Sequence, residues 1–233
     1  MNNFLVITGG SRGIGEKTIA YFLQEGWKAI NLSRTPCQLP GVDNIQVDLL
    51  EPEQIEEITS TLQSKLKGAD NIALVHNAAF YKRDTIDALP IAQLQQTLMV
   101  NVVAAITLNQ MVIPVMPPKS SIIYIGTTLA EKAVPGSASY TVSKHAIVGL
   151  MKATCQDLAG RQIRSCLVNP GLVDTQLLKD TMDKETLTFL LDTQVIGKRL
   201  IAPEEIAKVI YFCATNEVIN GSIIRANLGQ VSD

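Results

Sequence analysis

Short apolar runs alternate with longer helical patterns along the whole chain, and this rhythm restricts the fold more than any other feature. The apolar runs fall at 4–8, 28–33, 44–49, 71–78, 121–127, 163–170 and 222–226. Segments with helical periodicity lie between them, at 13–26, 51–67, 91–113, 137–160 and 204–214. Such alternation is typical of a parallel sheet whose right-handed crossovers place helices on both faces. We therefore predict an α/β fold with one doubly wound parallel sheet of about seven strands, in a single domain over residues 1–233.

One segment departs from this rhythm. Residues 172–201 mix polar and apolar side chains after the run at 163–170. Ligands of open α/β sheets bind outside the carboxyl ends of the strands, so we predict that this segment is a substrate lid. Its apolar residues favour an apolar substituent on the substrate, although the same residues at helical spacing would also serve simple packing. These residues are Leu177, Leu178, Met182, Leu187, Phe189 and Leu190.

Composition excludes several classes of protein. Hydrophobic residues make up 46% of the chain, which is enough for a full core, and the net charge is −2 without any long block of like charge. A nucleic-acid or anionic-membrane partner would require a basic surface, so we expect neither. The N-terminus has no basic region typical of a signal peptide, and we expect no apolar run to approach the roughly 20 residues of a membrane span. The 4 cysteines lie far apart and the 2 histidines complete no metal-binding spacing, so we predict a cytoplasmic protein with reduced cysteines and no metal.

A glycine-rich turn follows the first apolar run. Residues 8–15 read TGGSRGIG, between a predicted strand and a predicted helix. Glycines there let the backbone approach a pyrophosphate closely, and the helix N-terminus supplies free N–H groups. The simpler alternative is a tight turn without a ligand. The predicted contacts with a dinucleotide, in a Rossmann-type fold, come from Gly9, Ser11, Arg12, Gly13, Ile14 and Gly15.

The end of the second predicted strand indicates which dinucleotide is bound. NAD-binding proteins usually carry Asp or Glu there for the ribose 2′-hydroxyl, but residues 31–34 read NLSR. Arg34 together with Arg12 would hold a 2′-phosphate, so we predict that NADP(H) is preferred over NAD(H). The alternative is that both arginines are ordinary surface residues. Asp48 is placed to bind the adenine amino group, or else it is an acid at the start of the helix that follows Pro52.

A tyrosine and a lysine lie four positions apart in a predicted helix, at Tyr140 and Lys144. Residues i and i+4 share one helix face. A nearby ammonium favours the phenolate and would lower the tyrosine pKa from about 10 towards neutrality. The pair would then exchange a proton at cellular pH. The alternative is an exposed pair on a solvated face.

Taken together, these motifs resemble the short-chain dehydrogenase/reductase family over essentially the whole chain and in the same order. The similar stretches are TGGSRGIG, HNAA at 76–79, Asn101 within LMVNVVAAI, YIGTTLA, Y-x-x-x-K, and NPG at 169–171 followed by Thr175. The resemblance implies an NADPH-dependent oxidoreductase that reduces a ketone to an alcohol. It also implies further cofactor contacts from Leu49, Asn77, Ala78, Pro170, Gly171, Val173 and Thr175, besides Tyr140 and Lys144.

The same resemblance implies the catalytic roles. Tyr140 would protonate the carbonyl oxygen as hydride arrives, and Lys144 would lower the tyrosine pKa and bind the nicotinamide ribose. Asn101 would hold a water in a proton relay from Lys144. The serine that usually orients the substrate is replaced by Thr127, although Thr128 is an alternative hydroxyl.

Other positions depart from the family pattern. His76 and Ala79 stand where the family has Asn and Gly, and we expect His76 to be a satisfied histidine at a strand end. The tail reads RANLGQVSD without the paired glycines of many members, so the resemblance gives no prediction for the C-terminal wall of the pocket or for the tetramer contact nearby.

The pattern is closest to the 3-oxoacyl-[acyl-carrier-protein] reductase branch. Arg161 and Lys119 are candidate contacts for a carrier protein, or else solvated cations at helix ends. The resemblance implies a homotetramer or homodimer formed through the helices near 91–113 and 137–160. Two alternatives remain: a catalytically silent NADP(H)-sensing protein, and an NAD-linked alcohol or polyol dehydrogenase.

Overall fold

A single parallel sheet organises the described part of the chain. The computed structural model describes residues 1–182, 184–192, 194 and 196–230. Its 7-stranded sheet has the order β3-β2-β1-β4-β5-β6-β7, with every neighbouring pair parallel. The strands are β1 (Asn3–Thr8), β2 (Lys28–Ser33), β3 (Val42–Gln46), β4 (Asn71–His76), β5 (Ser121–Ile125), β6 (Arg164–Pro170) and β7 (Ser222–Ala226). The predicted doubly wound α/β fold is confirmed, and its strand order reverses between β1 and β4, where such folds bind ligands.

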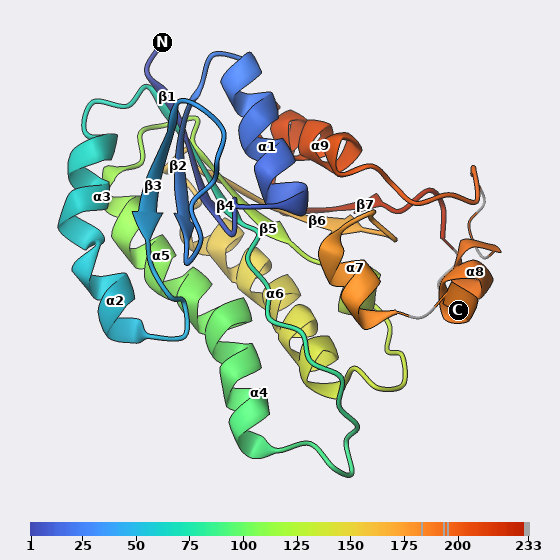
Figure 1. The fold of residues 1–233 in the computed structure, drawn as a ribbon. Helices are drawn as coiled ribbons and strands as arrows, with labels where there is room; N and C mark the ends of the chain where they lie inside the picture. The colour runs from blue at the N-terminus through green and yellow to red at the C-terminus, as the bar shows by residue number, and fades with distance from the viewer. Residues whose placement is uncertain (183, 193, 195, 231–233) are drawn as a thin grey trace.

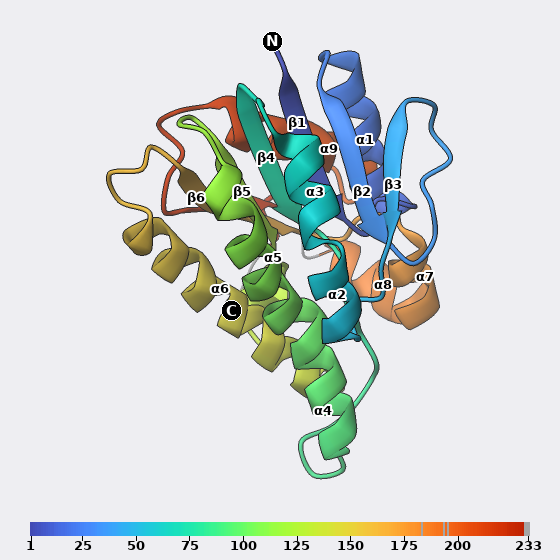
Figure 2. The ribbon, with the colours of Figure 1, turned by 90° about the vertical axis from the view of Figure 1, so that its left-hand side faces the viewer.

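Helices cover both faces of this sheet (Figure 1). One face carries α1 (Gly13–Gln24) and α9 (Pro203–Thr215). The other carries α2 (Pro52–Glu57), α3 (Thr59–Leu66), α4 (Ile91–Leu98), α5 (Ala104–Val112) and α6 (Ala138–Asp157), and Figure 2 shows these helices in front of the strands. The lid segment forms α7 (Gln176–Thr181) and α8 (Lys184–Asp192), which stand apart from both layers (Figure 1).

The core follows from the pleat of the strands. Successive side chains of a strand point to opposite faces. Phe4 and Val6 accordingly belong to the apolar cluster beneath α2, α3, α5 and α6, whereas Leu5 and Ile7 belong to the cluster beneath α1 and α9. This two-sided burial explains why β1 reads as a continuous apolar run.

The long apolar helix requires a correction. Residues Ile91–Val115 form a continuous helix of 25 residues that contains an 18-residue window with a mean hydropathy of 1.8, which is long and apolar enough to cross a membrane by length and composition. The expectation that no apolar run approaches that length was therefore wrong. Leu108, Met111 and Val112 of this helix are buried in the core against the sheet. Core helices pass the same test, so the finding is weak evidence for a membrane.

Two predicted elements have different boundaries. The third strand ends at Gln46 rather than at residue 49, although Val47 and Leu49 are still buried in the core. Their apolar side chains extended the predicted strand beyond its hydrogen-bonded part. The predicted helix over 51–67 is two helices, α2 and α3, which meet at Ile58.

Candidate active site

A cavity of about 920 Å³ lies beyond the carboxyl ends of the strands and extends under α7 and α8. Most of the predicted site residues line it together. They are Gly9, Ser11, Arg12, Gly13, Ile14, Arg34, Asp48, Leu49, Asn77, Ala78, Thr127, Tyr140, Lys144, Pro170, Gly171, Val173 and Thr175. Two predicted residues, Gly15 and Asn101, lie behind this lining rather than in it.

The glycine loop has the shape that a pyrophosphate requires. Gly9 and Gly13 have φ values of +68° and +57°, where a side chain is strained. A Cβ added to Gly15 would lie 2.2 Å from the carbonyl oxygen of Gly9, so this glycine packs the helix against the loop. Arg12 is the N-cap of α1 and makes no side-chain cap, which leaves the first N–H groups of a 12-residue helix available to an anion.

Asn31 holds this loop from below. Its Oδ1 accepts a hydrogen bond from the backbone N–H of Gly10 at 2.8 Å, and the side chain is buried. Its Nδ2 donates to Asn44 Oδ1 and to Ser33 Oγ, both at 2.9 Å. Asn31 lies in the stretch where NAD-binding proteins carry an acid for the ribose hydroxyl. In this chain it fixes the glycine loop instead, a role that the local sequence pattern does not reveal.

Two arginines and one aspartate line the cavity beside the glycine loop and the ends of β2 and β3. Arg34 Nη1 lies 3.8 Å from Asp48 Oδ2, and the Arg34 side chain is 72% exposed. Arg12 is exposed and makes no ion pair among the described residues. Asp48 Oδ1 accepts from the N–H of Leu50 at 3.0 Å, while the N-cap of α2 is Glu51, so Asp48 is not the capping acid of that helix. The glycine cradle and the two arginines fit a dinucleotide phosphate.

Tyr140 and Lys144 lie on the buried face of α6, in its first two turns. Lys144 Nζ donates to the carbonyl oxygen of Ile125 at 2.8 Å and lies 5.4 Å from the centroid of the Tyr140 ring. Burial lowers the pKa of Lys144 to about 8. The expected lowering of the Tyr140 pKa is not observed, because burial, and then the nearby Tyr81, raise that pKa above its ordinary value. Tyr140 is therefore a neutral phenol with its proton in place.

A hydrogen-bonded chain orients the segment that carries Thr127. The backbone N–H of Thr127 donates to Asn169 Oδ1 at 3.2 Å, and Asn169 Nδ2 donates to Glu131 Oε1 at 3.3 Å. Glu131 in turn accepts from Arg225 Nε at 2.7 Å. Thr127 Oγ1 also accepts from the N–H of Leu129. The hydroxyl-bearing turn after β5 is thereby fixed to β6 and β7.

Both candidate hydroxyls lie in the cavity wall. Thr127 and Thr128 line the cavity together. Thr127 is held through its backbone and its side chain, whereas Thr128 accepts a backbone hydrogen bond from the N–H of Glu131 at 3.2 Å.

Asn101 supports the site from behind, within a π-helical turn (Met99–Val103) that joins α4 to α5. Its Oδ1 accepts from the N–H of Phe80 at 2.7 Å, and its Nδ2 donates to Phe80 O and to Ser143 Oγ at 3.0 and 2.9 Å. Its side chain is therefore fully engaged. Asn101 and Lys144 both line a separate cavity of about 10 Å³, about the volume that one water needs.

The predicted site omitted an acid, Asp84, that anchors the start of α6. Its carboxylate accepts from the N–H of Ser139 at 3.0 Å, from the hydroxyl of Ser139, and from Gln93 Nε2 at 2.7 Å. Burial would raise the pKa of Asp84, but these hydrogen bonds outweigh it and hold the pKa below its ordinary value. Ser139 precedes Tyr140, so Asp84 positions the turn that carries the tyrosine. The two partners are 55 residues apart in sequence, which is why no local motif indicated them.

Tyr81 is a second residue that the sequence did not single out. Its ring meets the Tyr140 ring edge-on with centroids 5.1 Å apart, and it lines the cavity. An aromatic residue at a loop position carries no motif by itself, so only the fold reveals its contact with the tyrosine.

His76 is a core residue, as predicted. Its Nε2 is hydrogen-bonded to Asn109 Oδ1 at 2.8 Å, and its ring stacks on Tyr124 at 4.9 Å. Burial lowers its pKa to about 4. Ala79, the other departure in this stretch, lines the cavity.

The substrate half of the cavity combines an apolar lid with a few polar groups. Five of the six predicted lid residues line it, whereas Leu187 does not. Gln230 also lines the cavity; its side chain is buried, and its Oε1 has no hydrogen-bond partner among the described residues. An unpaired buried acceptor is costly, and this oxygen is itself buried behind the cavity surface.

Comparison with known proteins gives matches along nearly the whole chain. A family model described as enoyl-(acyl carrier protein) reductase matches residues 9–230. The 3-oxoacyl-[acyl-carrier-protein] reductase FabG of Thermotoga maritima is 30% identical, over 97% of this chain and 96% of that protein.

Solved structures agree. A short-chain dehydrogenase family protein from Francisella tularensis superposes with a TM-score of 0.90 and 27% identity, covering 99% of this chain and 98% of the other. L-Sorbose reductase from Gluconobacter frateurii, solved with NADPH and L-sorbose, gives a TM-score of 0.88 with 26% identity, covering 100% and 97%. With the sheet order, the glycine loop and the Tyr140–Lys144 pair, these matches lead to one conclusion: the chain belongs to the short-chain dehydrogenase/reductase family of oxidoreductases.

Proposed function

We propose that the protein is an NADP(H)-dependent reductase that converts a ketone to an alcohol, acting as a single domain over residues 1–233. One observation carries the proposal: Tyr140, Lys144 and Thr127 line the same cavity as the glycine loop, Arg12 and Arg34. A dinucleotide on the loop and a carbonyl beside Tyr140 would therefore share one partly enclosed cavity.

The roles of the side chains follow from their protonation states. The cofactor would supply the hydride to the carbonyl carbon. Tyr140, neutral because burial raises its pKa, would give its proton to the carbonyl oxygen as the alcohol forms. Lys144, whose pKa is lowered to about 8, would return a proton to the tyrosine. The hydroxyl of Thr127 would orient the carbonyl, with Thr128 as the alternative donor.

The path by which Lys144 is reprotonated is part of the same proposal. The side chain of Asn101 is occupied by Phe80 and Ser143. A relay water would therefore sit in the small cavity shared by Asn101 and Lys144 and bind a main-chain group of the π-helical turn rather than the asparagine side chain.

The preference for NADP(H) rests on charge. Arg12 and Arg34 both line the cavity, and the end of β2 carries no acid for a ribose hydroxyl. L-Sorbose reductase, one of the similar structures, holds NADPH, which supports the assignment by analogy. Arg34→Ala should lower NADPH affinity and leave NADH affinity unchanged; an equal loss for both cofactors would favour an NAD-linked alcohol or polyol dehydrogenase instead.

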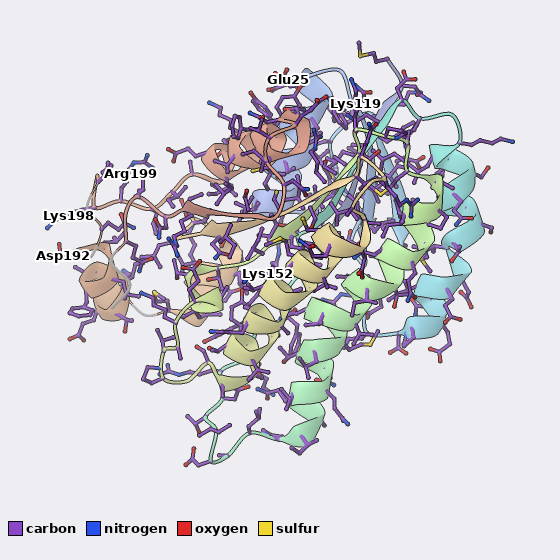
Figure 3. The ribbon with its side chains drawn as sticks, turned by 180° about the vertical axis from the view of Figure 1, so that it is seen from behind. Glu25, Lys119, Lys152, Asp192, Lys198 and Arg199 are labelled. Atoms are coloured by element: carbon purple, nitrogen blue, oxygen red, sulfur yellow. The ribbon has the colours of Figure 1, made fainter. Side chains whose placement is uncertain are left out.

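The proposal extends to the location, the oligomeric state and the partners of the protein. We place the protein in the cytoplasm as a homotetramer or homodimer that acts on a small molecule. A carrier protein docked through Lys119 and Arg161 is less favoured, because Lys119 pairs with Glu217 at 3.6 Å and Arg161 donates to the carbonyl oxygen of Ile113. Figure 3 also shows Lys119 at the far side of the molecule from the lid residues Asp192, Lys198 and Arg199.

The first test is oxidation of NADPH by the purified protein with a neutral acetoacetyl thioester, beside NADH as control. Steady turnover with NADPH that Tyr140→Phe abolishes, while NADPH still binds, is the expected result. Turnover retained in Tyr140→Phe would refute the mechanism. Binding of NADPH without turnover on any ketone would favour the silent NADP(H)-sensing alternative.

A further inference from the structure

Cationic side chains outnumber acidic ones in the lining of the cavity. Its lining contains five cationic side chains and one acidic side chain among the described residues, although the whole chain has a net charge of −2. The acid, Asp48, lies beside Arg34. These charged residues are Arg12, Arg34, Asp48, Arg83, Lys132 and Lys144.

The proposed function accounts for part of this charge. Arg12 and Arg34 are assigned to the cofactor phosphate, and Lys144 to the proton relay. Arg83 and Lys132 have no role in that mechanism, yet both line the cavity that contains Tyr140. Arg83 belongs to the loop of Tyr81, which packs against Tyr140, so this cation lies on the side of the cavity where the substrate would bind.

Arg83 lies close to the start of the helix that carries the tyrosine. A Cβ added to Gly136 would lie 2.9 Å from Arg83 Nε, so the arginine side chain lies against the backbone there, and Gly136 has a φ of +81°. The next residue, Asp84, donates its N–H to Gly136 O at 3.2 Å. Tyr81, on the same loop, packs edge-on against Tyr140. The Arg83 side chain is exposed, and these contacts place its loop against the start of the helix that carries Tyr140.

The nearby acids are engaged elsewhere. Asp84 is buried and bonded to Ser139 and Gln93, and Glu131 bonds Arg225 and Asn169. Neither acid lines the cavity, and Arg83 makes no ion pair among the described residues. A cation that lines a partly enclosed cavity without a protein counter-ion favours an anionic ligand.

We infer that the substrate is a ketone carrying an anionic group, a carboxylate in the simplest case, which binds Arg83. The inference rests on the proposed function and narrows its substrate class. The apolar lid would cover the carbon chain between the two polar ends.

A pair of ketones that differ only in charge provides the test. The keto acids 4-oxopentanoate and 5-oxohexanoate are compared with their ethyl esters, by NADPH oxidation and by quenching of NADPH fluorescence on binding. The acids should be preferred by about tenfold or more, as a charge-assisted hydrogen bond implies. Raising the salt from about 0.1 M to about 1 M should reduce that preference, because the Debye length shrinks.

Arg83→Gln is the informative variant, and Lys82→Gln is its matched control. Lys82 is the adjacent exposed cation, and it does not line the cavity. The acid-to-ester ratio should fall towards one in Arg83→Gln and remain unchanged in Lys82→Gln. The melting temperature and NADPH affinity verify that both variants are folded.

The outcomes separate the inference from the proposed function. Turnover of esters as fast as acids, or equal effects of the two variants, would overturn the inference and leave the reductase standing. Tighter binding of the acids without any turnover would retain the anionic ligand and reject the reductase. Absence of both turnover and charge preference would reject the two together.

Discussion

Acidic pH should destabilise the protein because the buried imidazole of His76 resists protonation in the folded state. His76 is 7% exposed, stacks on Tyr124 and is bonded to Asn109. Its pKa falls from 6.5 to about 4, chiefly because burial disfavours the charged ring. As the pH drops below 6.5, the unfolded chain takes up a proton that the folded chain refuses until pH 4. Stability is therefore complete above pH 6.5 and lost as the pH falls towards 4, by about 3 kcal/mol at 1.36 kcal/mol per pKa unit.

Urea unfolding at several pH values between about 4 and 7 measures this loss. Because carboxylates also titrate at the acid end, the informative quantity is the difference between variants. His76→Gln should have a pH dependence flatter than the unmodified protein by about 3 kcal/mol over this window. His145→Gln, which removes an exposed histidine of α6, should follow the unmodified protein. If His76→Gln and the unmodified protein lose stability in parallel, then His76 is not a neutral core residue.

Three further substitutions test the site. Gly15→Ala should abolish NADPH binding and destabilise the fold by about 1–3 kcal/mol, because the added Cβ would lie 2.2 Å from Gly9 O. Its control, Gly149→Ala, has no atom within 4 Å of the added Cβ and should stabilise α6 by up to about 1 kcal/mol. Urea unfolding measures both changes, and equal effects would contradict the packing role of Gly15. Lys144→Met should raise the free energy of unfolding at pH 7 by about 3 kcal/mol and remove turnover, because burial lowers the lysine pKa from 10.5 to about 8 and the folded protein must hold a buried charge below pH 8. For the same reason, the stability of the unmodified protein should rise between pH 8 and 10.5. A flat stability profile in that range would refute the argument. Asp84→Asn should lower kcat about tenfold or more with NADPH affinity retained, because it weakens the hydrogen bonds to Ser139 and Gln93; an unchanged kcat would show that this carboxylate does not position Tyr140.

The sequence predicted the parts of the molecule that depend on local patterns. Continuous apolar runs identify strands buried on both faces, and β1, β2 and β7 matched their predicted ranges closely. The glycine loop and the Tyr140–Lys144 pair are likewise local, and the structure brings them to one cavity. The raised pKa of Tyr140 was not predictable, since it depends on burial and on Tyr81 rather than on the lysine one turn away.

Contacts between distant segments escaped prediction for the same reason. Asp84 and Ser139 meet only because the loop after β4 folds over the start of α6. The boundary of β3 was missed because Val47 and Leu49 remain buried after the strand has ended. Side-chain hydrophobicity reports burial, whereas a strand boundary depends on backbone pairing.

The separate duty of Asn31 has a consequence for how this cofactor site can evolve. The residue that fixes the glycine loop is Asn31, whereas the residue proposed to bind the 2′-phosphate is Arg34, which lines the cavity with an exposed side chain. A mutation of Arg34 can therefore change which dinucleotide is accepted without loosening the loop. The stability of the glycine loop and the choice of dinucleotide thus depend on different side chains. Substitutions at the exposed position could exchange one cofactor for the other in evolution while the buried amide of Asn31 stays the same.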